Sequence, residues 1–148
     1  MSVETKALVR RLYEEVWNKR RLEIVHEIIS PSHALNDPQI TGSGVGPDAY
    51  KRQVTQFIAA FPDLQLTVED IIAEKDRVVV AWLVSGTHKR EFRGVPPSNK
   101  KVTIQGITIN HIANGKITDS DVSADYLGLL QQLGVAPTFG QLKSAAAR

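Results

Sequence analysis

Residues 101–123 read KVTIQGITINHIANGKITDSDVS, and this stretch decides the fold. Apolar and polar side chains alternate on both sides of Asn114-Gly115, a residue pair that favours a two-residue turn between antiparallel strands. The pattern therefore predicts a β-hairpin, with one strand over 101–112 and a returning strand over 117–123. Because strand side chains point alternately to the two faces of a sheet, each face of the hairpin carries a defined set of side chains. One face carries Thr108, Asn110, Ser120 and Val122, and the other carries Ile107 and Ile109.

Two more strands are predicted before the hairpin. Leu64, Leu66 and Val68 alternate with polar residues, which is typical of a strand with one buried face. Residues 77–87 are rich in valine, a β-branched residue that favours strands. Residues 74–76, Glu-Lys-Asp, provide the turn between these two strands. The run of strands predicts an antiparallel sheet.

Helical periodicity dominates the chain before these strands. It predicts a first helix over 3–18, a second that ends before Pro31, and a third that begins at Pro47. The polar, glycine-rich stretch 36–46 is predicted to be a loop, and a closing helix ends near Gly134. The apolar positions that define the four helices are Val9, Leu12, Tyr13 and Val16; Ile24, Val25, Ile28 and Ile29; Tyr50, Val54, Phe57 and Ile58; and Tyr126, Leu129, Leu130 and Leu133.

Helices followed by antiparallel strands indicate an α+β domain in which the helices cover one face of a single curved sheet. Such a cone-shaped sheet leaves an apolar pocket at its wide end, the usual place for a small ligand. The 148 residues suit one domain with one core. We therefore expect a single domain over residues 1–136, including the short C-terminal helix, and a loosely specified tail over 137–148.

Composition and charge argue against several classes of function. The net charge is +2, from 18 Lys and Arg against 16 Asp and Glu, and the cations are not clustered as binding to nucleic acid requires. The chain has no cysteine, which excludes disulfides, thiolate metal sites and a cysteine nucleophile. The four histidines, at 26, 33, 88 and 111, show no metal-ligand spacing. We expect neither a metal nor a nucleic-acid partner.

The sequence contains no stretch of about 18 apolar residues that could span a membrane. Its first residues enter a charged helical pattern and not the apolar run of a signal peptide. We therefore expect a cytoplasmic protein without membrane contact, which is compatible with the lack of cysteine.

Six short motifs follow one another along the chain: LVRRLYEEVWN at 8–18, FPDL at 61–64, GTH at 86–88, FRGVPP at 92–97, NGKI at 114–117 and LLQQLG at 129–134. Their order and spacing resemble the SnoaL-like polyketide (ester) cyclases of the nuclear transport factor 2-like superfamily. The resemblance spans about residues 4–135. It implies an α+β cone, a homodimer packed through the sheets, no cofactor, and a pocket for small hydrophobic ring compounds.

The resemblance also implies a reaction and a set of catalytic positions. These cyclases close a ring by an intramolecular aldol step, which needs a base near a carbonyl and donors that hold the enolate. The family's acid/base aspartate lies five residues after the isoleucine of the Gly-Lys-Ile hairpin, which is Val122 here. Asp121 comes one residue earlier and faces the opposite side of the strand, unless a β-bulge turns it inward. A histidine of the cyclases, on the preceding strand, corresponds to Thr108.

The ketosteroid isomerases of the same superfamily resemble this chain at two other residues. Their oxyanion tyrosine on the first helix matches Tyr13, and their base, an aspartate followed by proline, matches Asp37 before Pro38. Their third group, a protonated aspartate, matches Thr108. A carboxylate at the mouth of an apolar pocket is partly desolvated and basic, and a buried phenol donates to the enolate. Asp37 is therefore the favoured base and Asp121 the reserve.

The predicted substrate-binding residues come from the resemblance and from strand alternation. An inward Asn110 needs a polar partner, which favours contact with a ligand or water. Trp17 is either a ring-stacking aromatic or a core residue, and His88 is either a ligand contact or a structural hydrogen-bonding residue. The full set is Tyr13, Trp17, Asn36, His88, Thr108, Asn110, Ser120 and Val122.

The sequence leaves several functions open. The leading one is an enzyme that binds a small hydrophobic carbonyl compound and promotes ring closure or proton transfer through an enolate. A ketosteroid isomerase-like enzyme would use Asp37 and Tyr13. A non-catalytic binding domain would have lost its acid/base group at Val122, and a domain that only dimerises would have its cavity filled by side chains. An inward carboxylate favours an enzyme, whereas Asp37 and Asp121 both facing solvent would favour binding alone.

Overall fold

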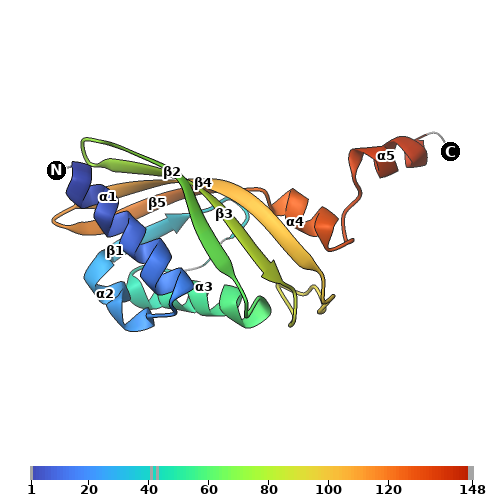
Figure 1. Cartoon of the computed structure of the whole chain (residues 1–148), viewed down its shortest axis with the longest axis horizontal. Coiled ribbons are helices and arrows are strands. Elements are labelled where there is room, and N and C mark those ends of the chain that lie inside the picture. The colour runs from blue at the N-terminus through green and yellow to red at the C-terminus, as the bar shows by residue number, and fades with distance from the viewer. Residues whose placement is uncertain (1, 41, 43, 147–148) are drawn as a thin grey trace.

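The computed structural model describes residues 2–40, 42 and 44–146, and its helices and strands are arranged as in Figure 1. The chain begins with α1 (Ser2–Arg11), which continues as a π-helical segment (Leu12–Asn18). A short 3₁₀ turn (Leu22–Ile24) and α2 (Val25–Ile28) lead into β1 (Ile29–Asn36). Next come α3 (Pro47–Ala60), β2 (Gln65–Glu74), β3 (Arg77–Thr87), β4 (Lys101–Ala113) and β5 (Lys116–Ala124). The last elements are α4 (Tyr126–Gln132) and α5 (Phe139–Ala146).

The strands form one sheet in the order β1-β5-β4-β3-β2, and the hairpin predicted from residues 101–123 is its β4–β5 pair. In this pair Thr108 lies opposite Val122, and Asn110 lies opposite Ser120. These four side chains therefore share one face, as predicted. The α+β fold, with helices against one face of a curved sheet, is confirmed.

The first strand departs from the prediction. The sequence predicts a helix through Ile29 and an entirely antiparallel sheet, but Ile29 opens β1, which pairs in parallel with β5. The pairing of β1 with β5 is interrupted between Ile29 and Ala34. Apolar–polar alternation predicts a strand only where its pairing is regular, so this segment gives no clear strand signal. Pro31 is tolerated because β1 is at the edge of the sheet, where one side of the strand needs no partner.

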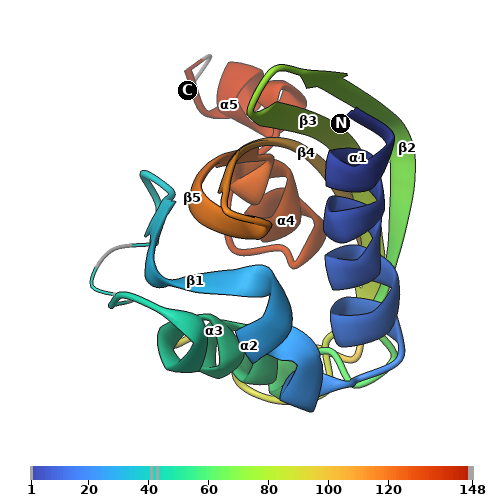
Figure 2. The ribbon, with the colours of Figure 1, turned by 90° about the vertical axis from the view of Figure 1, so that its left-hand side faces the viewer.

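Helices cover the concave face of the sheet (Figure 2). α1 and the π-helical segment pack against β2 and β3, and α3 packs against β1. The core between these layers contains fully buried aliphatic side chains such as Val9, Val54 and Val80. Burial of one such side chain contributes about 2 kcal/mol. On the opposite face, Ile107 and Ile109 are 52% and 37% exposed.

α4, at the end of the domain, is hydrogen-bonded to β4. Its cap residue, Asp125, accepts a hydrogen bond from the N–H of Gly128, and the N–H of Asp125 donates to the carbonyl of Gln105. The side-chain amide of Gln132 donates to the carbonyl of Thr103 at 2.9 Å and accepts from its N–H at 2.8 Å. These contacts fix α4 at two points along β4.

The tail expected over 137–148 contains α5, which projects away from the rest of the molecule (Figure 1). Phe139 at its start is 85% exposed. Within the part of the chain that the structure describes, no helix is long and apolar enough to cross a membrane.

Candidate functional site

A cavity of about 100 Å³ lies between the helices and the concave face of the sheet. The π-helical segment, the end of β1, α3, the sheet and α4 all contribute to its wall. Most lining side chains are apolar or aromatic, which favours a hydrophobic ligand. The polar side chains of the wall, apart from tyrosines and tryptophans, are Asp37, Gln53, Thr108, Asn110 and Ser120.

Asp37 is the carboxylate of this cavity, because no other acidic side chain among the described residues lines it. The residue directly follows β1 and is 6% exposed. The hydroxyl of Tyr126 donates to Oδ2 of Asp37 at 2.8 Å, and the backbone N–H of Gln39 donates to Oδ1 at 3.0 Å. These two hydrogen bonds fix the orientation of the carboxylate and leave acceptor capacity on each oxygen. The favoured base of the sequence analysis therefore lies inside the cavity wall.

Tyr126, at the start of α4, is half-buried beside Asp37. Burial raises the pKa of its phenol, and the hydrogen bond to Asp37 and the charge of that carboxylate raise it further. The phenol therefore keeps its proton around neutral pH and remains a donor to Asp37.

Tyr13 lies on the π-helical segment, where it is buried and lines the cavity. π-Helical turns are rare and are frequently found at functional sites. Burial raises the pKa of the Tyr13 phenol, and hydrogen bonds with Thr108 and Asn110 act in the opposite direction. A protonated phenol next to these two polar side chains is suited to holding a developing enolate oxygen.

A buried chain of hydrogen bonds positions the polar residues of β4 and β5. Nε2 of His33 lies 3.0 Å from Oγ of Ser120, which donates to Oδ1 of Asn110 at 2.9 Å. The indole N–H of Trp82 donates to Oγ1 of Thr108 at 2.9 Å. Burial lowers the pKa of His33 to about 4, so its imidazole is neutral at pH 7. Because their polar atoms have partners, these side chains keep one arrangement in the wall.

An aromatic group forms the helical side of the cavity. The indole N–H of Trp17 donates to the hydroxyl of Tyr50 at 2.9 Å, and Trp17 makes edge-to-face contacts with Tyr50 and Phe57. The structure therefore places Trp17 in the wall, held by neighbouring rings, where it could contact the edge of a bound ring.

Gly106 in β4 leaves room for the indole of Trp82. A Cβ atom at this position would lie 2.3 Å from Cζ2 of Trp82 and 2.9 Å from the carbonyl oxygen of Ser123. Such a close approach would displace the indole and its hydrogen bond to Thr108. The glycine is therefore required by the packing of the cavity wall.

We expect Gly106→Ala to lower the free energy of unfolding by about 2 kcal/mol, because overpacking a core costs roughly this much. Urea unfolding followed by far-UV circular dichroism measures the change. Gln105→Ala, on the exposed side of the same strand, is the control and should change stability by less than about 0.5 kcal/mol. Equal stabilities of Gly106→Ala and the wild type would contradict the assigned crowding.

The four hairpin side chains predicted to line the pocket do so: Thr108, Asn110, Ser120 and Val122 are all in the wall. Val122 therefore presents an apolar side chain at the position where the resemblance expects the acid/base aspartate. The carboxylate of the site is therefore Asp37, which follows β1, and not a residue of β5.

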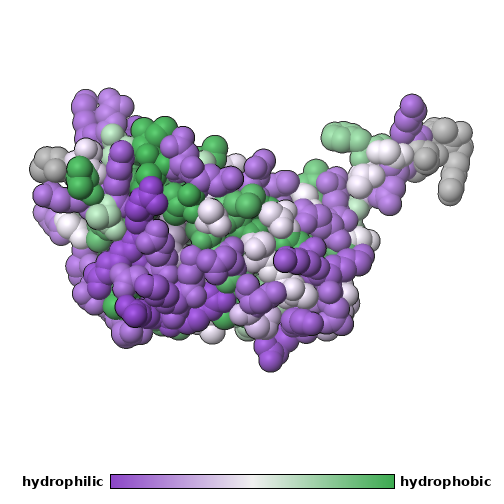
Figure 3. Space-filling view, in the orientation of Figure 1, coloured by the Kyte–Doolittle hydropathy of each residue, from purple (hydrophilic) through white to green (hydrophobic). Residues whose placement is uncertain are grey.

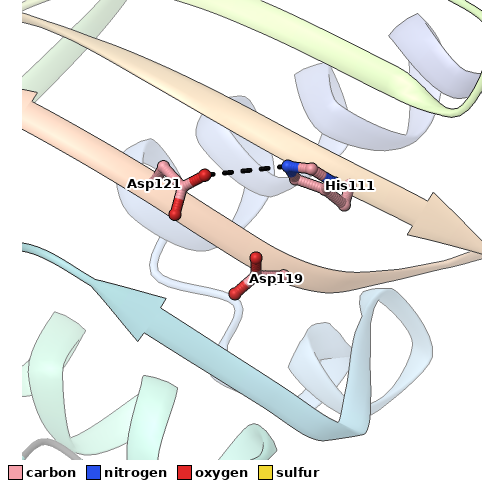
Figure 4. A group of neighbouring side chains, drawn as sticks. All are labelled: His111, Asp119 and Asp121. Atoms are coloured by element: carbon pink, nitrogen blue, oxygen red, sulfur yellow. Dashed lines mark ion pairs between the residues drawn. The ribbon is translucent and has the colours of Figure 1, made fainter.

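Asp121, the reserve base, is on the other side of the sheet, and no bulge turns it inward (Figure 4). Its Oδ2 lies 3.7 Å from Nε2 of His111. The side-chain amide of Asn36 donates to Oδ1 of Asp119 at 2.7 Å and to Oδ1 of Asp121 at 2.9 Å. Asn36 and Asp121 therefore lie outside the wall of this cavity, because each is one residue from an inward-facing position. Both border an adjoining depression on the outer side of the sheet.

Figure 4 also shows a grouping that spacing along the sequence does not reveal. The nearest potential ligand atoms of His111, Asp119 and Asp121 all lie within 4.8 Å of one another. The three residues come from two neighbouring strands, so only their pairing brings them together. Asp119 and Asp121 are two residues apart on β5 and so share a face, and the amide of Asn36 bridges their carboxylates.

His88 is fully buried but does not line the cavity. Its Nδ1 lies 3.1 Å from Oγ of Ser98, and its ring stacks on Phe61 with centroids 5.3 Å apart. Its backbone N–H donates to the carbonyl of Lys100. His88 therefore lies outside the wall of this cavity, and its contacts support a structural role.

Several residues of the site are not predicted as site residues, among them Gln53, Tyr126, Trp82 and His33, which lies behind the wall. Helical periodicity indicates only an apolar-stripe position for Tyr126, and its contact with Asp37 joins residues 89 positions apart. His33 lies in the unpredicted strand β1. Trp82 was assigned to a strand, but its hydrogen bond to Thr108 depends on the β3–β4 register. No pattern among neighbouring residues predicts these contacts.

Comparisons with known proteins agree with this fold. The family model for SnoaL-like polyketide cyclases matches residues 7–133. Nogalonic acid methyl ester cyclase of Streptomyces nogalater is 32% identical over 120 residues, which are 80% of this chain and 89% of that protein. Aklanonic acid methyl ester cyclase DauD of Streptomyces sp. (strain C5) is 29% identical over 134 residues, 86% of this chain and 80% of that protein.

Solved structures show the same similarity. A candidate polyketide cyclase from Acidithiobacillus ferrooxidans has a TM-score of 0.81 at 29% identity, over 93% of this chain and 99% of its own. AclR, a candidate hydroxylase from Streptomyces galilaeus, has a TM-score of 0.78 at 29% identity, over 93% of this chain and 100% of its own. Because the family model covers most of the chain and the fold agrees, the protein belongs to the SnoaL-like polyketide cyclase family.

Proposed function

We propose that the protein binds a small hydrophobic carbonyl compound in this cavity and promotes enolate chemistry by acid/base catalysis without a cofactor. Asp37 takes a proton from the carbon next to the carbonyl, and Tyr13 and Asn110 donate hydrogen bonds to the enolate oxygen. The enolate then closes a ring by an intramolecular aldol step or accepts the proton at another carbon. The similarity to two methyl ester cyclases supports ring closure.

The observation that carries this proposal is that a buried carboxylate and a buried phenol line the same apolar cavity. A base removes a carbon-bound proton only when it is held within hydrogen-bond reach of the substrate. In an apolar site, a fixed donor stabilises the developing enolate charge more strongly than water does. Asp37 and Tyr13 are therefore suited to these complementary roles.

The size of the cavity bears on the substrate. About 100 Å³ is less than the roughly 300–1,000 Å³ that is usual for small-molecule pockets. A one- or two-ring ketone therefore needs less movement of the wall than a multi-ring polyketide ester. Asp37 and Val122 also border an adjoining depression of about 570 Å³ on the side of Ile107 and Asp121.

Isotope exchange tests the proposal with the wild-type protein. The compact probe is 1-tetralone and the multi-ring probe is aklanonic acid methyl ester. Their binding is followed by the fluorescence of Trp17 and Trp82, which both line the cavity. NMR in D₂O measures exchange of the protons next to the tetralone carbonyl, and chromatography measures ring closure of the ester. Acceleration over buffer supports the enzyme, whereas binding of both probes without acceleration would leave a binding protein.

A ketosteroid isomerase-like reaction is the second candidate. Asp37 and Tyr13, the two positions that resemble those enzymes, line one cavity. The same carboxylate would carry a proton between two carbons of a β,γ-unsaturated ketone. The ultraviolet absorbance of the conjugated product, with 5-androstene-3,17-dione as probe, measures this activity. Absence of conversion alongside tetralone exchange would favour ring closure over isomerisation.

A non-catalytic binding domain is favoured by one observation, the apolar Val122 at the expected position of the family's aspartate. The exchange experiment separates this function from both enzymes. If the protein only binds, both probes would still quench tryptophan fluorescence, and neither proton exchange nor ring closure would exceed its rate in buffer.

We also propose a homodimer that packs through the outer faces of two sheets. Ile72, Ile107 and Ile109 are exposed there, and no helix covers this face in Figure 2. Figure 3 shows hydrophobic side chains gathered over the region of β2, β3 and β4. Pairing two such faces would remove this apolar surface from water.

The wild-type chain should show twice its mass of 16.3 kDa in light scattering coupled to size-exclusion chromatography. We expect the double variant Ile107→Lys/Ile109→Lys to be monomeric at the same concentration, because it would place charges in the interface. Its circular dichroism should stay unchanged. The control is Val3→Lys, an exposed residue of α1, which should remain dimeric. A monomeric wild type would refute the dimer.

A further inference from the structure

Asp37 and Tyr126 share a hydrogen bond in the cavity wall, in a site whose family aspartate position is occupied by Val122. We propose that the two side chains form a proton relay in which Tyr126 is the general acid of ring closure. This inference rests on the proposed function, because it names the group that protonates the product oxygen after Asp37 has formed the enolate.

The relay is held from two separate parts of the fold. Tyr126 is the first residue of α4, and the preceding Asp125 anchors that end of the helix to Gln105 of β4. The position of the phenol therefore does not depend on the segment after β1 that carries the carboxylate. Asp37 is held from the other side by the N–H of Gln39, and the resulting O···O distance to Tyr126 is 2.8 Å. A proton can pass directly across a hydrogen bond of this length.

The steps balance without any other reactant. Asp37 takes a proton from the carbon next to a carbonyl, and the electron pair of that C–H bond forms the enolate. The enolate carbon bonds to a second carbonyl carbon of the same molecule, and the π electrons of that carbonyl become an alkoxide. Tyr126 gives its hydroxyl proton to the alkoxide and takes back the proton that Asp37 had acquired. Both side chains return to their starting states.

The electrostatics of the pair favour this order of events. Before the reaction, burial and the charge of Asp37 raise the pKa of Tyr126, so the phenol holds its proton while the carboxylate acts as base. Once Asp37 is protonated, that charge is gone and the phenol becomes a better donor. Tyr13 is not needed for this step, since its hydroxyl lies against Thr108 and Asn110 on the sheet.

Two activities of one variant test the relay. Tyr126→Phe removes one of the two hydrogen bonds that orient Asp37, so it should slow both the exchange of 1-tetralone protons and the closure of aklanonic acid methyl ester. Closure should fall by about a hundredfold more than exchange, a usual contribution of a general acid, because exchange needs a base and the enolate donors but no general acid. Tyr50→Phe removes another hydroxyl from the same wall. We expect it to change both rates in the same proportion, so that their ratio stays at the wild-type value.

The outcomes separate the relay from the proposed function. Equal losses of exchange and closure in Tyr126→Phe, with an unchanged melting temperature, would mean that Tyr126 only positions Asp37 and would overturn the relay. Unchanged closure would also overturn it, as would a wild type that exchanges tetralone protons but closes no ring. In these cases Asp37 could still be the base. Failure of the wild type to accelerate either reaction would instead refute the proposed function.

Discussion

Asp37→Asn is expected to slow the exchange of 1-tetralone protons by about a thousandfold, within the range contributed by a positioned general base. The amide has nearly the shape of the carboxylate but cannot take a proton. It still offers an oxygen to the hydroxyl of Tyr126, which now donates to Oδ2 at 2.8 Å. Quenching of tryptophan fluorescence by tetralone should stay within about threefold, because the apolar wall is unchanged. NMR in D₂O measures the exchange rate.

The matched control is Asp121→Asn. Asp121 is the reserve base of the sequence analysis, but its side chain faces the outer surface near His111. We expect exchange within about twofold of the wild type. If Asp121→Asn abolished exchange while Asp37→Asn did not, the base would be on the outer face and the assignment of the cavity would be wrong.

The stability of the fold is expected to fall as the pH is lowered from 7.5 to 5, and His33 is a main cause. Burial lowers its pKa in the folded state from 6.5 to about 4, while the charge of Asp119 partly opposes this shift. Between these two values the unfolded chain binds a proton that the folded chain does not. The contribution of neutral His33 to the free energy of unfolding is therefore fully present above about pH 6.5 and is lost as the pH falls toward 4. At pH 5 the loss should be about 2 kcal/mol.

Urea unfolding of the wild type and of His33→Gln at pH 7.5 and pH 5 isolates this contribution. Glutamine can still bond to Ser120, the present partner of Nε2, but it does not titrate. We expect the variant to be less stable than the wild type at pH 7.5 and to lose about 2 kcal/mol less on acidification. Parallel losses in the two proteins would show that His33 does not control the pH dependence.

Much of the fold could be predicted from local pattern. Alternation around Asn114-Gly115 placed Thr108, Asn110 and Ser120 on one face of a hairpin, and the structure confirms this placement. The reason is physical: a strand has a period of two, so one correct turn determines the side on which every residue lies. The same rule predicted that Asp121 faces away from the cavity.

Where the pattern was weak, prediction failed. β1 breaks its register between Ile29 and Ala34 and runs parallel to a strand more than 80 residues away in sequence. A parallel partner is not joined by a short turn, so no neighbouring residues indicate it. The side chains of Asn36 and His88 do not line the cavity, because their contacts hold them elsewhere.

The sequence by itself determined the α+β class, the hairpin face and the family, because these depend on periodicity and on motifs that lie close together along the chain. Only the tertiary structure decided which carboxylate faces the cavity. Asp37 and Tyr126 meet because the parallel edge strand β1 ends close to where α4 begins. Contacts between such distant segments depend on how whole elements pack, and no local run of residues encodes that packing.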